Sequence, residues 1–113
     1  MVSKQDCLSK LNKISAYKQN WNGYGADPFD KDLIAKCKEI INNIFVYPMV
    51  FPTANDSINL EYKNSKVYFE IEVFSVACTL FCEIDGKCAT VELSSISQAI
   101  DWWNILTQMA KER

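Results

Sequence analysis

Acidic side chains at alternating positions are the residues of this chain that could do chemistry. Glu70 and Glu72 stand two residues apart in residues 67–73, where apolar and polar residues alternate. Residues two apart on a β-strand project from the same face of the sheet, so the two carboxylates would lie together. Close carboxylates can bind a divalent cation or share a proton. They also suit a solvated strand face, and we favour that interpretation over a metal-dependent enzyme, which remains a distant alternative.

The residues and motifs that other catalytic sites require are absent from this sequence. The chain of 113 residues contains no histidine, which is the commonest general base near neutral pH and the commonest metal ligand. A Ser–His or Cys–His nucleophile therefore cannot be assembled. The Gly23-x-Gly25 pair lacks the third glycine and the preceding strand of a dinucleotide-binding turn. We predict that the protein is not an enzyme and has no cofactor and no metal.

Five cysteines are present, and we interpret them as small core residues. Their odd number, in a chain whose polar N-terminus lacks the apolar segment of a secretory signal, argues against a disulfide framework. No Cys-x-x-Cys pair occurs, so a zinc site is the weaker interpretation. The five are Cys7, Cys37, Cys78, Cys82 and Cys88.

Aromatic residues share the predicted acidic face. The same alternation places Tyr68 beside Glu70 and Glu72, with Phe81 on the next strand. Aromatic side chains among charged ones on an exposed sheet favour a protein-binding surface; the alternative is that they pack beneath the chain termini or beneath residues 49–51. The candidate partner-binding residues are Glu61, Tyr68, Glu70, Glu72, Phe81, Glu83 and Trp102.

The charge balance indicates the kind of partner. Net charge is −2, and residues 57–93 carry three lysines against six carboxylates. Such a surface disfavours nucleic acid and suits a larger protein with a basic surface. No apolar run is long enough to cross a bilayer, so we expect a cytoplasmic protein with no membrane partner.

Hydrophobic periodicity predicts the elements that must position these residues. We expect helices over residues 4–18 and from Asp27 to before Pro48, and then a crossover segment over residues 49–56. Period-two alternation predicts strands near residues 58–62, 67–73, 78–84 and 89–93. A last helix follows a capping box, Ser95-x-x-Gln98. The expected fold is α+β, a single domain over residues 1–113 in the order ααββββα, with a four-stranded antiparallel meander and the helices packed on one face.

Two aromatic clusters lie outside the sheet. Trp21 and Tyr24 flank the glycine pair, and we expect them to plug the corner between the first two helices. Trp102 and Trp103 are neighbours on the last helix and so point to different faces. One should be core, and the other should either be an interface anchor or cover the glycine corner. The alternative function is therefore a homo-oligomeric structural or regulatory module, such as a homodimer, that associates through this helix around Trp102, Ile105 and Met109.

The glycine corner also carries a resemblance. Residues 21–26 (WNGYGA), residues 48–53 (PMVFPT) and residues 58–62 (INLEY) resemble a group of small bacterial proteins of unassigned function with a W-D-G-Y-G-A motif, a P-x-x-x-P-T segment and a strand ending in Glu-Trp. Asn22 replaces the usual Asp and Tyr62 the usual Trp, and residues 55–57 replace a usual Asp-Gly turn. The resemblance covers about residues 10–75, implies a bacterial or phage origin and gives no residue a role. It favours a small acidic inhibitor or neutraliser of the anti-defence, antitoxin or immunity type.

Overall fold

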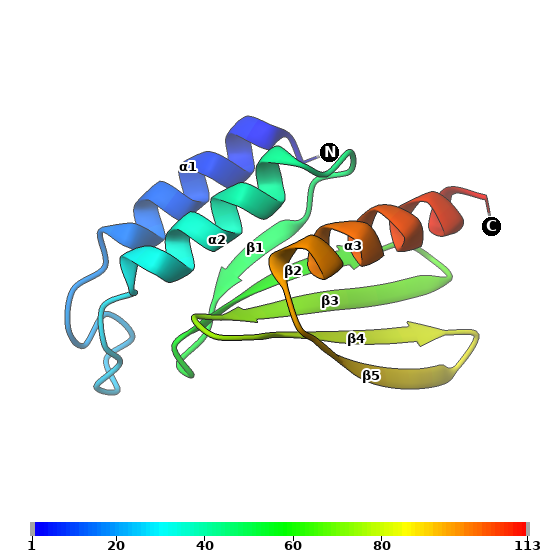
Figure 1. The fold of residues 1–113 in the computed structure, drawn as a ribbon. Coiled ribbons are helices and arrows are strands. Elements are labelled where there is room, and N and C mark those ends of the chain that lie inside the picture. Colours follow the sequence, from blue (N-terminus) through cyan, green and yellow to red (C-terminus); the bar gives the residue numbers. More distant parts are fainter. Residues whose placement is uncertain (1, 113) are drawn as a thin grey trace.

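The computed structural model describes residues 2–112, and its helices lie on one face of an antiparallel sheet (Figure 1). The helices are α1 (Lys4–Ser15), α2 (Lys31–Asn42) and α3 (Ile96–Lys111). The strands are β1 (Met49–Pro52), β2 (Ser57–Lys63), β3 (Val67–Phe74), β4 (Cys78–Ile84) and β5 (Lys87–Leu93), paired in chain order. The predicted α+β class, the antiparallel meander and the single helical layer are confirmed. The predicted number of strands is wrong, because the sheet has five.

The additional strand is β1, which lies in the segment that we expected to be a crossover. Met49 pairs with Glu61 and Phe51 with Asn59, both on β2. The turn-rich residues 53–56 are the hairpin loop, in which Asp56 adopts a positive φ of 57° and the Thr53 amide donates to the Ser57 carbonyl at 3.0 Å. Pro52 is tolerated because an edge strand pairs on one side only.

Both N-terminal helices are shorter than their predicted spans. The first begins as expected, with Ser3 and Asp6 exchanging capping hydrogen bonds, but it ends at Ser15 rather than at residue 18. The second begins at Lys31, with Asp30 as its N-cap, and not at Asp27. Residues 27–30 are held outside the helix: the Trp21 Nε1 donates to the Asp27 carbonyl at 2.9 Å.

The glycine corner is built as expected around Trp21 but not around Tyr24. The Trp21 ring stacks on Tyr17 at a centroid distance of 5.1 Å and contacts Phe29 at 5.5 Å. Tyr24 is 92% exposed, so its predicted role in the plug is wrong. Gly25 has a φ of +85°, which other residues adopt only with strain.

The core lies between the helices and the sheet. Trp103 is fully buried; its Nε1 donates to the Val46 carbonyl at 2.7 Å, and its ring meets Phe69 edge-on at 5.1 Å. The buried apolar residues form one cluster that joins all three helices to the inner face of the sheet. Trp102, its neighbour on α3, is 40% exposed. Of the two adjacent tryptophans, the structure therefore assigns Trp103 to the core.

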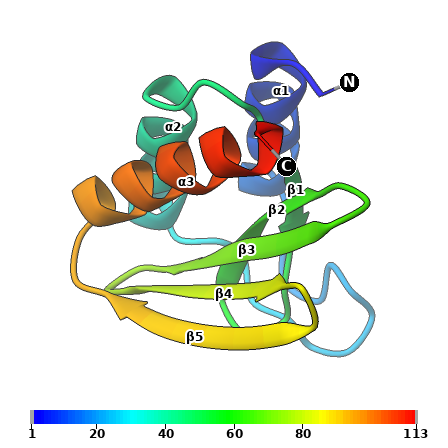
Figure 2. The same cartoon turned by 90° about the vertical axis from the view of Figure 1, so that its right-hand side faces the viewer.

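The cysteines divide between the core and the surface. Cys7, Cys37 and Cys78 are buried, and all five cysteines are free. Burial raises the pKa of Cys7 to about 11 and that of Cys37 to about 12, because a thiolate is poorly solvated in the core. Cys88 is exposed, so the core interpretation is wrong for it. Cys88 lies opposite Glu83 in the register and therefore on the sheet face turned away from the helices, which all lie above the sheet in Figure 2.

Candidate functional site

The sheet face turned away from the helices, called the open face below, carries six of the seven predicted site residues. Directly opposite residues on antiparallel strands share a face. The register therefore sets side chains in three rows across the sheet. The rows are Met49–Glu61–Glu70–Phe81–Thr90, Lys63–Tyr68–Glu83–Cys88 and Phe51–Asn59–Glu72–Thr79–Glu92. Trp102 lies on α3, on the other side of the sheet, and does not join them.

Glu70 is the centre of a hydrogen-bond network on this face. Its Oε2 accepts from the Tyr68 hydroxyl at 2.9 Å and from the Asn59 Nδ2 at 3.2 Å. Burial, together with the adjacent carboxylates of Glu70 and Glu61, raises the pKa of Tyr68 above its ordinary value. The phenol therefore stays protonated and remains a donor to Glu70.

Glu72 is held in the same way, by a neutral donor. The Ser57 hydroxyl, which is buried, donates to the Glu72 Oε2 at 2.5 Å and lies 2.6 Å from the Thr53 Oγ1. These donors orient the two carboxylates without bringing a positive charge to them. Among residues 2–112 the Asn59 Oδ1 is buried with no hydrogen-bond partner, which leaves an unused acceptor between Glu70 and Glu72.

The aromatic residues of the open face are not covered by residues 49–51. Tyr68 and Phe81 contact each other at a centroid distance of 6.1 Å. In the register, Glu61 and Glu70 lie between Met49 and Phe81, so two strands separate β1 from Phe81. The first and last described elements, α1 and α3, lie on the helical side of the sheet (Figure 1). The alternative in which the aromatics pack beneath these segments is therefore wrong.

Met49 and Phe51 instead extend the open face at its β1 edge. They are 51% and 39% exposed, and sequence reasoning missed them as site residues because their segment was not predicted to be a strand. The sequence carried no clear signal, because Met49, Val50 and Phe51 are all apolar. The alternation of a half-buried strand shows only in the structure, where Val50 alone of the three is buried.

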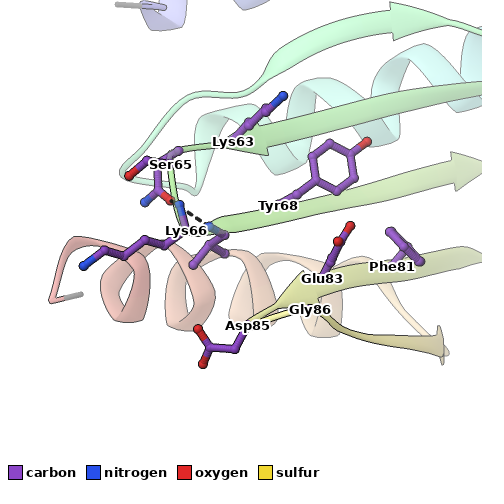
Figure 3. A pocket seen from close by; sticks show the side chains of 10 residues that line it. Lys63, Ser65, Lys66, Tyr68, Phe81, Glu83, Asp85 and Gly86 are labelled. Carbon is purple, nitrogen blue, oxygen red and sulfur yellow. Dashed lines mark hydrogen bonds between the residues drawn. The ribbon is translucent and has the colours of Figure 1, made fainter.

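A concavity lies at one end of the open face, between the β2–β3 loop and the β4–β5 turn (Figure 3). It has a volume of about 680 Å³. Tyr68, Phe81 and Glu83 project from neighbouring strands into the same space, with Lys63 on the next strand. The lining holds two carboxylate residues, Glu83 and Asp85, and two lysines, Lys63 and Lys66. The Tyr68 and Phe81 rings beside Glu83 form an aromatic wall with a carboxylate, which is suited to a long side chain of a partner protein, such as lysine or arginine.

Metal-ligating groups do not gather on the open face or elsewhere in residues 2–112. No group of three or more Cys, Asp or Glu side chains in this range is placed to hold a metal ion. The acidic residues of the site lie in rows whose members alternate with aromatic and amide side chains. The arrangement offers carboxylate, aromatic and amide groups to a contacting molecule.

Comparison of the chain with models of known protein families, with curated proteins and with solved structures finds no match. The resemblance to the W-D-G-Y-G-A group therefore stays a prediction. No helix within residues 2–112 has the length and apolar character needed to cross a membrane.

Proposed function

We propose that this chain is a non-catalytic protein-binding module whose open face docks onto a basic surface of a larger protein and inhibits or neutralises it. The observation that carries the proposal is the row Glu61–Glu70–Phe81, which the helices leave uncovered. Tyr68 and Met49 extend it with amphipathic and flexible apolar surface, and tyrosine, phenylalanine and methionine are enriched at protein interfaces.

The carboxylates of this row are costly for the fold. Glu61 and Glu70 are directly opposite each other, and like charges in that position destabilise a sheet. Proteins break such local rules chiefly at functional sites. A basic partner would relieve the repulsion and offer donors to the oxygens that Tyr68 and Ser57 leave free.

The experiment is a comparative capture from a bacterial lysate. The bait is the wild-type chain, a Glu70→Gln/Glu72→Gln variant, or a matched variant, Glu39→Gln/Asp101→Asn. The matched variant removes the same charge from exposed helical positions. We expect one protein to be captured at near-equal stoichiometry by the wild type and by the helical variant and to be lost with the open-face variant.

The captured protein then allows a kinetic test. Neutralising Glu70 and Glu72 should slow association by about tenfold or more at low salt and flatten the salt dependence of the rate, because steering by opposite charges acts on encounter. Equal capture and equal rates for the two double variants would remove the open face from the proposal.

A further inference from the structure

The outer edge of β5 is unprotected. β5 is the last strand of the sheet, is seven residues long and contains no proline. Residues 87–92 are all exposed. The opposite edge differs, because β1 has four residues, ends in Pro52 and packs against α1. Soluble proteins normally blunt or cover long sheet edges, since unpaired N–H and C=O groups invite another strand.

The backbone groups that point outward from β5 can be assigned from its hairpin. β4 and β5 are joined by the two-residue turn Asp85-Gly86, with φ values of 54° and 77°. In such a turn the flanking pair, Ile84 and Lys87, exchanges hydrogen bonds, and hydrogen-bonded pairs then alternate along the ladder. Cys88, Thr90 and Glu92 therefore present their N–H and C=O groups to the free edge.

An apolar flank on α3 lies on the same side of the molecule as this edge. Asn104 bonds to the Asn43 carbonyl and the Phe45 amide, which marks the α3 flank that faces the end of α2. Helical geometry places Trp102 and Met109 on the other flank, towards β4 and β5, and they are 40% and 43% exposed. On the inner face of β5, Val91 is 37% exposed. The helical layer thus leaves apolar surface uncovered beside a free edge.

We propose that this edge pairs with β5 of a second copy of the chain, antiparallel, about a two-fold axis through Thr90. The two sheets become continuous, and both helical layers lie on the same side. In this register Thr90 faces Thr90 of the second copy, Cys88 faces Glu92, and Val91 faces Ala89. The exposed flanks carrying Trp102 then approach each other over the joined strands.

A second copy fits this edge better than an arbitrary strand does. An interface of two-fold symmetry must be complementary to itself. Lys87 begins β5 and Glu92 lies near its end, and they are the only charged residues of the strand. Lys87 lies on the inner face of β5 and Glu92 on the open face. Antiparallel pairing sets Lys87 beside Leu93 of the second copy and Glu92 beside Cys88, so that no like charges meet, whereas parallel pairing in register would set like charges side by side. Cross-strand threonine pairs are also favourable.

Cysteine cross-linking tests the register directly. In the proposed dimer, Cys88 faces residue 92 of the second copy at a Cα separation of about 5.5 Å, which a disulfide can span. Oxidised glutathione would therefore convert Glu92→Cys to a covalent dimer on a non-reducing gel, joined through residues 88 and 92. Wild type and Ala89→Cys, whose residue 89 faces Val91, would remain single chains. No excess dimer for Glu92→Cys over Ala89→Cys would overturn the register.

Sedimentation velocity over a wide concentration range tests the association itself. The wild type should approach twice the monomer mass as its concentration rises, and a strict monomer would overturn the proposal. Thr90→Pro removes an outward amide but leaves the β4–β5 ladder intact, so it should remain monomeric. Val91→Lys keeps every backbone amide and sets a charge on the inner face beside the free edge, so it should also remain monomeric. A dimer unaffected by both variants would place self-association elsewhere.

Pairing of β5 with a second copy and partner binding by the open face can be tested independently of each other. Glu70→Gln/Glu72→Gln should leave the dimer intact, while Val91→Lys, whose side chain lies on the inner face and outside the open-face rows, should leave partner capture intact. If wild-type chains stay monomeric but Val91→Lys loses a captured protein, the edge binds a strand of that protein instead, and the second copy is excluded as its occupant.

Discussion

Glu61 and Glu70 lie directly opposite each other on β2 and β3, on the same face of the sheet. The carboxylates at directly paired positions repel each other. Glu61→Gln keeps an acceptor for Tyr68 and removes this repulsion. We expect it to raise the free energy of unfolding by about 0.2–1 kcal/mol, measured by urea denaturation at low salt, with a smaller gain at high salt because the repulsion is screened.

Glu83→Gln is the matched control for this change. Glu83 is paired with Tyr68 and Cys88 rather than with another carboxylate, so the free energy of unfolding should stay within about 0.5 kcal/mol of the wild type. An equal gain from both substitutions would indicate a general charge effect and not the Glu61–Glu70 pair.

The hydroxyl of Tyr68 should make the protein less stable at alkaline pH. Burial and Glu70 raise its pKa above the ordinary 10.0 in the folded state. Above that pH the unfolded chain loses the phenolic proton before the folded chain does, so the free energy of unfolding falls as pH rises. Tyr68→Phe lacks this proton and should lose less stability between neutral and strongly alkaline pH, measured by urea denaturation.

Phenolate absorbance gives an independent reading of the same group. The chain has five tyrosines, and one should ionise later than the others in the folded protein. This late step should be missing in Tyr68→Phe. If the late step persists in that variant, another tyrosine causes it and the hydrogen bond to Glu70 does not hold the proton.

The two adjacent tryptophans should respond very differently to substitution. Trp103→Phe leaves a cavity in the core and removes the donor to the Val46 carbonyl, so it should lower the free energy of unfolding by about 2–4 kcal/mol. Trp102→Phe changes a side chain that is 40% exposed and should have an effect within about 0.5 kcal/mol. Guanidinium denaturation of dilute protein, where self-association is weak, measures both, and similar losses would contradict the assignment of Trp103 alone to the core.

Substitutions of Gly25 test whether the backbone conformation of this residue alone shapes the glycine corner. A Cβ at this position would meet nothing within 4 Å, but the φ of +85° is unfavourable for residues with a side chain. Gly25→Ala should cost about 1–2 kcal/mol of unfolding free energy, and Gly25→Asn less, because asparagine tolerates left-handed conformations better. Thermal unfolding of the two variants gives the order, and equal stability of Gly25→Ala and wild type would show that the corner can rearrange.

The sequence by itself determined which strand residues share a face. Alternation places Tyr68, Glu70 and Glu72 together whatever the strand's neighbours are, because the side-chain period of a strand is two and a slip of one residue would bury the charges. The cap of α3 is local as well: the Ser95 Oγ accepts from the Gln98 amide at 3.1 Å. Its return bond goes from the Ser94 amide to Gln98 at 2.8 Å, one residue earlier than a capping box places it.

Only the tertiary structure decided which surfaces stay uncovered. The residues of β1 are too few to show a clear period, and pairing with β2 makes them a strand. Trp102 and Trp103 have the same chemistry, and the packing of α3 against Phe69 and the Val46 carbonyl buries one of them. Ala89 and Val91 alternate as a half-buried strand does, yet they stay exposed because the helical layer covers only the Leu93 end of β5. Periodicity is a property of the chain, whereas the area that three helices can cover depends on their lengths and crossing positions over the sheet.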